Sequence, residues 1–232
     1  MSALPQPSLK LLQDQEVLGE LLHSLSQPLT SLRCSLELSF DEVAEQQQAT
    51  VSVALQQTEK VIGMVQLMRE YLDAEEPGSE AHPVALAPAV RAVVEELSSI
   101  AGLRGIRLPL VGNCTASVPV SEPRLRLALQ YLLAALIQAA PADSEITLQL
   151  EEGWSESVLR VECEKGAWLR DDGTRGPHLK RDSVSGALGK VRIAIASRVL
   201  EAAGAFLAFE GGDRSGFVLR IPRWLATSST PA

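Results

Sequence analysis

His23 is the residue in this 232-residue chain whose type and setting could do chemistry. It stands in a stretch where leucines recur at steps of three and four residues, which predicts an amphipathic helix. Because each helical residue turns by about 100°, His23 lies next to Leu22 at the edge of the leucine stripe, and its imidazole is expected to reach solvent. Gln27 and Thr30 follow at i+4 and i+7 and fall on the same flank. The sequence therefore predicts an exposed imidazole beside two polar side chains on one face of a helix.

Pro28 interrupts the hydrogen-bond ladder of this predicted helix close to the histidine. Proline has no N–H to donate to the carbonyl of Ser24, and its ring presses against that carbonyl. We therefore expect the helix to kink beside His23. The alternative is that Pro28 ends one short helix, in which case His23 is an ordinary surface histidine.

Two long helices must position His23. Helical periodicity runs from Ser8 to about Ser39, and again after Asp41, a candidate N-cap, until a Glu-Glu-Pro-Gly stretch at 75–78 stops it. Each helix would be about 45 Å long. Two helices cannot cover apolar stripes of that length, so we expect the hairpin to pair with a second copy in a four-helix bundle, as a homodimer. The alternative is that the hairpin packs onto the C-terminal domain.

The bulk composition excludes several classes of function. The formal net charge is −8 and the chain has no block of lysine or arginine, so we expect no nucleic-acid partner. No apolar run reaches the ~18 residues that a membrane span needs, and residues 1–7 lack the pattern of a signal peptide, which favours a cytoplasmic protein. Cys34, Cys114 and Cys163 are odd in number and far apart, so they indicate neither a disulfide framework nor a zinc site.

Composition shifts divide the chain into four predicted parts. Residues 1–75 form the helical hairpin, and residues 76–84, with two prolines and a glycine, form a linker. Residues 85–225 form a second domain, and residues 226–232 are expected to be a disordered tail.

The second domain mixes helical and strand patterns. The expected elements are a helix over 86–101, strands at 106–111 and 116–120, a helix opened by Ser121 and running over 125–136, strands at 146–151 and 157–163, a long loop at 164–189, a helix over 191–203, and strands at 206–210 and 216–222. This order predicts an α/β sandwich with helices on one face of a mixed sheet, and the whole chain is predicted to be of the α+β class.

Two sets of residues resemble a known family. The string His-x-Leu-x-x-Pro-Leu-Thr at 23–30 resembles the phosphoacceptor box of two-component sensor histidine kinases, particularly the variant with Gln-Pro-Leu-Thr. The order of elements after the linker resembles the ATP-binding domain of these kinases and the related gyrase/Hsp90-type ATPases. The resemblance covers roughly residues 9–222. It implies that His23 is the phosphoacceptor, and that Gln27 and Thr30 help to shape the face that binds a partner.

The motifs that would bind ATP depart from the kinase pattern. The two asparagines that hold magnesium in the family would fall on Tyr131 and Ala135, and alanine offers no oxygen ligand. The adenine-recognising Asp-x-Gly-x-Gly would fall near 164–168, which keeps one glycine. In the phosphate-covering glycine loop, Lys190 and Arg192 replace two glycines, and their side chains prevent backbone amides from cradling phosphate in the family's way.

Ser24 is a fourth departure. In the kinases the residue after the histidine is usually an acid, which orients and deprotonates the imidazole, and serine cannot supply that charge at pH 7. The four departures predict a kinase-shaped protein that does not use ATP and binds no cofactor or metal of its own. If Tyr131, Trp168 or Arg192 fills the space between Ala135 and Gly189, ATP has no room.

The resemblance therefore implies a histidine phosphotransferase, similar to the dimeric bacterial phosphotransferases that keep a kinase's two-domain shape. It would relay a phosphoryl group between His23 and the aspartate of a response-regulator receiver domain, on which Mg²⁺ is expected. Two alternatives stay open. One is a non-catalytic dimeric pseudokinase scaffold, and the other is an active sensor histidine kinase with an atypical, basic ATP site.

Overall fold

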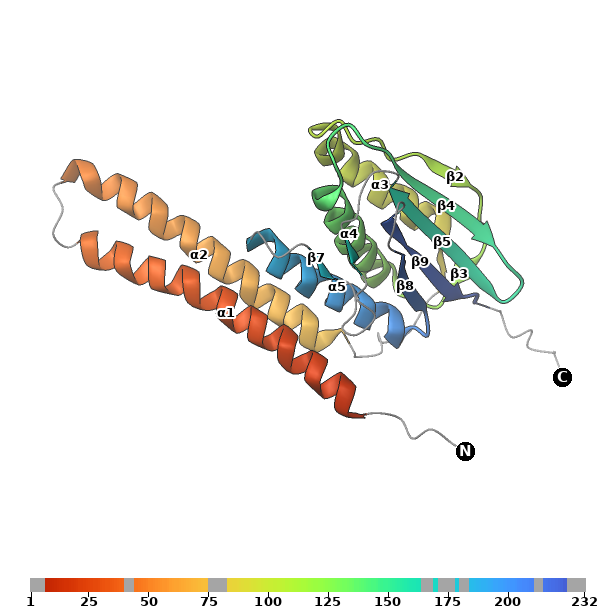
Figure 1. Cartoon of the computed structure of the whole chain (residues 1–232), viewed down its shortest axis with the longest axis horizontal. Helices are drawn as coiled ribbons and strands as arrows, with labels where there is room; N and C mark the ends of the chain where they lie inside the picture. The colour runs from red at the N-terminus through yellow and green to blue at the C-terminus, as the bar shows by residue number, and fades with distance from the viewer. Residues whose placement is uncertain are drawn as a thin grey trace. The chain divides into compact units, whose positions relative to one another are not determined.

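The computed structural model divides the chain into two compact units (Figure 1). The structure describes residues 7–39, 44–74, 83–163, 169–170, 178–179, 184–210 and 215–224. One unit comprises Met1–Asp73 with Asp182–Val191, and the other comprises Ala74–Arg181 with Arg192–Ala232. Within the described ranges, no helix combines the length and apolar character needed to cross a membrane.

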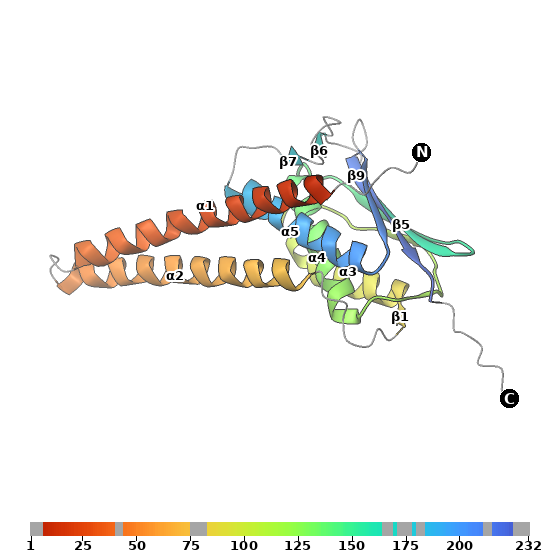
Figure 2. The same cartoon turned by 90° about the horizontal axis from the view of Figure 1, so that it is seen from below.

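The first unit contains an antiparallel pair of long helices, α1 (Pro7–Ser39) and α2 (Ala44–Asp73), which run side by side (Figures 1 and 2). The helical spacing of their apolar residues explains the pairing, because the buried positions of each helix form one seam. These buried positions include Val17, Leu21, Ser24 and Pro28 on α1 and Ala54, Met64, Leu67 and Tyr71 on α2. The predicted hairpin is confirmed, and Asp41, its predicted N-cap, lies outside the described residues.

The second unit is built on a five-stranded mixed sheet. In spatial order its strands are β2 (Leu110–Gly112), β4 (Ile146–Glu152), β5 (Glu156–Cys163), β9 (Ser215–Pro222) and β8 (Phe206–Glu210). The β2–β4 pair is parallel and the other pairs are antiparallel, which confirms the predicted mixed sheet. Register places Leu148, Val161 and Phe217 side by side on neighbouring strands, and each is at most 1% exposed. This row is part of the core.

Helices cover one face of this sheet: α3 (Leu86–Gly102), α4 (Glu122–Ala139) and the part of α5 (Val184–Ala202) that belongs to the second unit (Figure 2). Pro123 lies in the first turn of α4, where its missing N–H costs nothing. Ser121 is the N-cap residue, as predicted, with an extended backbone, and its side chain makes no capping hydrogen bond. At the other end, the Arg104 guanidinium donates to the carbonyls of Ile137 and Ala140 and so satisfies the last turn.

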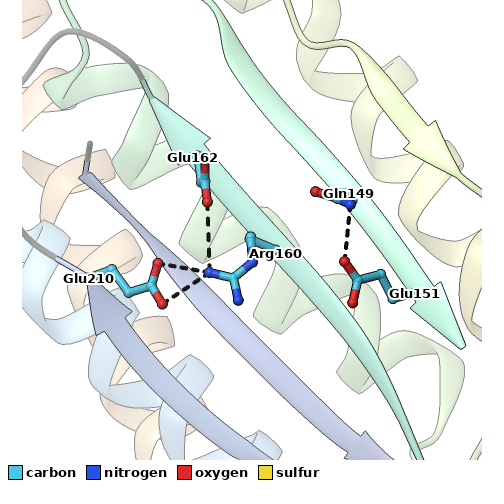
Figure 3. A network of polar contacts seen from close by, with 5 residues as sticks. All are labelled: Gln149, Glu151, Arg160, Glu162 and Glu210. Atoms are coloured by element: carbon cyan, nitrogen blue, oxygen red, sulfur yellow. Dashed lines mark hydrogen bonds and ion pairs between the residues drawn. The ribbon is translucent and has the colours of Figure 1, made fainter. Parts of the chain in front are cut away.

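The opposite face of the sheet carries polar side chains (Figure 3). Arg160 on β5 reaches Glu210 on β8 at 3.0 Å and Glu162 on its own strand at 3.7 Å. On β4, the amide of Gln149 donates to Glu151 at 3.0 Å. Strand side chains alternate between the two faces, so an apolar row toward the helices and a polar row toward solvent follow from the same sequence alternation.

Short strands account for most differences from the predicted elements. β1 (Val84–Ala85) pairs with β3 (Ser117–Val118), and β6 (Leu169–Arg170) pairs with β7 (His178–Leu179). The predicted strand at 116–120 therefore forms a separate two-stranded sheet. The strand predicted at 106–111 shrinks to β2, because Pro109 has no N–H to donate and only its carbonyl joins the ladder, accepting from Leu148 at 2.9 Å.

The last helix is longer than predicted. α5 begins at Val184, inside the predicted loop, so that prediction is wrong for 184–189. Its end agrees with the prediction, because Gly204 adopts a φ of +73° and its N–H donates to Glu201 at 2.9 Å.

A polar cluster fixes the end of β4 to its neighbours. The Glu152 carboxylate accepts hydrogen bonds from the backbone N–H and the hydroxyl of Thr115, at 2.7 and 2.9 Å, and pairs with Arg223 at 2.9 Å. Arg223 also donates to the carbonyl of Gly153 at 2.9 Å. The Thr115 backbone N–H, followed by the hydroxyl, holds the pKa of Glu152 below its ordinary value of 4.5.

We expect Glu152→Gln to lose stability at neutral pH and to approach the wild type in acid. The folded-state pKa is lowered, so the contribution is present above the unfolded pKa, near 4.5, and is lost as the pH falls through the folded value. The measurement is the urea midpoint of both proteins from neutral to acid pH. Glu151→Gln is the matched control, since its carboxylate binds the Gln149 amide rather than a backbone N–H. If the difference in urea midpoint between the wild type and Glu152→Gln did not change with pH, the lowered pKa of Glu152 would be contradicted.

Candidate functional site

His23 is exposed on α1. Leu21, two residues earlier, is 0% exposed and is one of the buried positions that form the seam of α1. Two residues correspond to about 200° of rotation, so His23 points away from that seam. Ser24, the next residue, is 9% exposed and turns back toward the seam. The helix therefore exposes the imidazole of His23, whereas the side chain of Ser24 is buried.

Gln27 and Thr30 share the exposed face of His23. They lie about 40° and 20° round the helix from the histidine, and both are exposed. The Thr30 hydroxyl donates to the carbonyl of Ser26 at 2.8 Å. Its proton is therefore used within the helix, and toward a partner Thr30 can act as a hydrogen-bond acceptor.

Pro28 does not end α1, which runs from Pro7 through to Ser39. The alternative of a short helix ending at Pro28 is wrong. Two side chains bond to the backbone around the proline: Ser26 donates to the carbonyl of Leu22 at 2.8 Å, and Thr30 donates to that of Ser26. Such i−4 hydroxyl bonds often accompany bent helices. The kink stays a prediction.

An apolar face borders His23. On both helices, exposed apolar side chains directly follow buried or half-buried ones, so in an antiparallel hairpin they fall on the same side. They are Leu22, Leu29 and Leu36 on α1 and Leu55, Ile62, Val65 and Leu72 on α2, each between 44% and 64% exposed. Exposed leucines at a seven-residue spacing are the pattern of a helix that packs against a further helix.

The positions compared above with magnesium ligands lie on α4. Ala135 is 6% exposed and has no oxygen in its side chain. The Tyr131 ring is covered by the Arg192 guanidinium, whose Cζ lies 5.6 Å from the ring centroid. In the described part of the chain no group of three His, Cys, Asp or Glu side chains is placed to hold a metal ion. The side chains present are a methyl group, a phenol and a cation, and none of them supplies the carboxylate or amide oxygen that Mg²⁺ prefers.

The segment compared with the glycine loop is helical. α5 already includes Gly186 and Gly189, and in an α-helix each N–H after the first turn bonds to the carbonyl four residues earlier. The N–H groups of Lys190 and Arg192 are therefore used within the helix and cannot surround a phosphate. Trp168 and the rest of 164–168 lie outside the described residues.

Comparison with known proteins rests on structure. No protein-family model and no curated protein sequence matches this chain. Among solved structures, the Acinetobacter baumannii histidine kinase AdeS matches with a TM-score of 0.65 and 18% identity, over 86% of this chain and 97% of that chain. The chain has the fold of a histidine kinase.

Two further structures agree. A histidine kinase from Burkholderia phymatum STM815 gives a TM-score of 0.51 at 18% identity, over 87% of this chain and 97% of that chain. ShkA, solved in complex with AMPPNP, gives 0.57 at 19% identity, over 91% of this chain and 46% of that chain. These similarities confirm the predicted order of a helical hairpin followed by an α/β domain of histidine-kinase type.

The sequence named most of these residues but missed one. Tyr131 and Arg192 were each expected to be incompatible with ATP, and the structure brings them into contact. The missed residue is Ser26, whose hydroxyl bonds to the turn that carries His23. This bond could have been predicted from the sequence, because Ser26 lies four residues after Leu22, the spacing at which a serine hydroxyl bonds to a backbone carbonyl in a helix. Thr30 stands in the same relation to Ser26.

Proposed function

We propose that this chain is a histidine phosphotransferase of two-component signalling, which passes a phosphoryl group between His23 and a response-regulator receiver aspartate without using ATP. The observation that carries the proposal is the combination of an exposed imidazole on a kinase-type helical hairpin with Tyr131, Ala135 and Arg192 at the positions compared with nucleotide-binding residues.

The residues of this chain have a limited task in that reaction. A neutral imidazole keeps a lone pair on one ring nitrogen, which attacks the phosphorus of the aspartyl phosphate. An N–P bond forms, the bond from phosphorus to the carboxyl oxygen breaks, and the aspartate carboxylate leaves. The receiver domain supplies the aspartate and its Mg²⁺. The rigid helix holds His23 for in-line approach, and Gln27 and the acceptor oxygen of Thr30 contact the docked domain.

We also propose that the hairpin pairs with a second copy of itself. The apolar face formed by Leu22, Leu29 and Leu36 with its counterpart on α2 extends along both helices. An exposed apolar face of that extent marks an interaction site, and a four-helix bundle buries it. His23 lies at the edge of this face, so dimerisation leaves the imidazole accessible.

Phosphotransfer is tested by mixing the purified protein with receiver domains of its host that carry labelled phosphate. We expect label on the wild type and complete loss of label with His23→Gln, because the amide is not a nucleophile for phosphorus. His178→Gln is the matched control and should keep the label. Label acquired from ATP alone would support the active kinase instead. Absence of label with every receiver domain would support the scaffold.

Dimerisation is tested with Ile62→Glu, a change at a position that is 52% exposed in the isolated hairpin. We expect light scattering to show one chain instead of two, since each copy would bury a charge at a cost of roughly 2 kcal/mol or more. Circular dichroism should show unchanged helix content. Leu103→Glu is the control, because Leu103 is 88% exposed in the other unit and should leave the mass unchanged. A monomeric wild type would disprove the paired bundle.

A further inference from the structure

We propose that Arg192 and Tyr131 form a latch, a direct side-chain contact that holds α5 against α4, at the positions compared above with the nucleotide-binding residues of the kinases. The proposal deepens the proposed function and rests on its premise that the chain does not use ATP. It assigns these two side chains a positive structural role, in addition to their incompatibility with a nucleotide.

The geometry of the pair carries the proposal. The Arg192 guanidinium lies over the Tyr131 ring at 5.6 Å, within the distance at which a cation is attracted to the face of an aromatic ring. Both side chains are half-buried. Water therefore has access to only part of each side chain. Removal from water strengthens a cation–π contact.

The burial of Arg192 Nε indicates what holds this side chain in place. Nε is inaccessible to solvent and has no hydrogen-bond partner among the described residues. An unsatisfied buried donor is unfavourable, so the arginine is held there by the tyrosine ring and by packing, against the hydrogen-bonding preference of its own Nε. A phosphate cannot reach this nitrogen unless the side chain first moves.

The other polar contacts of α4 explain why a latch on α5 matters. Arg126 and Gln130 of α4 both donate to Glu96 of α3, which ties these two helices together. The Arg192–Tyr131 contact is a comparable link from α4 to α5. Without it, we expect the second half of α5 to open locally more often than the rest of the unit.

The test is a double-mutant cycle on the full chain with Arg192→Met and Tyr131→Leu, which remove the charge and the ring while keeping apolar volume. We expect a coupling of about threefold to thirtyfold in the unfolding equilibrium constant, the range of a partly desolvated cation–π contact. Tyr131→Phe keeps a ring and should preserve most of the coupling. Hydrogen exchange of amides 193–202 should be faster in Arg192→Met and Tyr131→Leu, and close to wild type in Tyr131→Phe.

The control cycle pairs Arg126→Met with Tyr131→Leu, because Arg126 binds Glu96 and their effects should add. Additive effects of Arg192→Met and Tyr131→Leu would overturn the latch. A rise in the wild-type melting temperature with AMPPNP or inorganic phosphate, lost in Arg192→Met, would also overturn it by making Arg192 a ligand-binding residue. Coupling in a protein that takes no label at His23 would support the latch and reject the phosphotransferase. A protein that takes label at His23 but shows no coupling between Arg192 and Tyr131 would support the phosphotransferase and reject the latch.

Discussion

The continuity of α1 through Pro28 is the constraint on which the arrangement of the hairpin depends. Had the helix ended there, Leu29 and Leu36 would not extend the line of Leu22, and His23 would lie in the last turn of a short helix. Because the helix continues, one rigid element fixes both the exposed imidazole and the apolar face beside it. The hydroxyl bonds of Ser26 and Thr30 on either side of the proline supplement the ladder in the turns where it is weakest.

The strands of the main sheet are mostly predicted well: β4, β5, β8 and β9 lie within one residue of their predicted bounds. In β4 and β5, alternation of apolar and polar residues defines both the strand and its orientation. β1 and β3 are two-residue strands that exist through pairing with each other, and local periodicity carries no signal for such a pair. The start of α5 was missed for another reason. Gly186 and Gly189 are each unfavourable in a helix by about 1 kcal/mol, so local propensity favours a loop.

In the candidate site, too, some features could be predicted from the sequence and others could not. The exposure of His23 follows from counting 100° steps from a buried leucine, and the spacing of Gln27 and Thr30 follows from the same count. What the count could not give is the direction of the Thr30 hydroxyl, which the helix itself uses. Nor could it give the contact between Tyr131 and Arg192, since a sequence pattern does not show which residues of different helices meet.

A row of leucines at helical spacing builds the main core contact of α4. The residues that build the core of α4, Leu125, Leu129, Leu132 and Leu136, are at most 2% exposed and recur at helical spacing toward the sheet. Tyr131 and Ala135 occupy other positions of the same helix, so the positions compared with metal ligands can change while the sheet-facing row stays intact. Under the proposed function, a phosphoryl donor that brings its own metal would need from this chain a docking face and a displayed imidazole, and α1 displays that imidazole. Such a function would constrain the hairpin at His23, and in the α/β unit it would constrain the packing of helices such as α4 and α5.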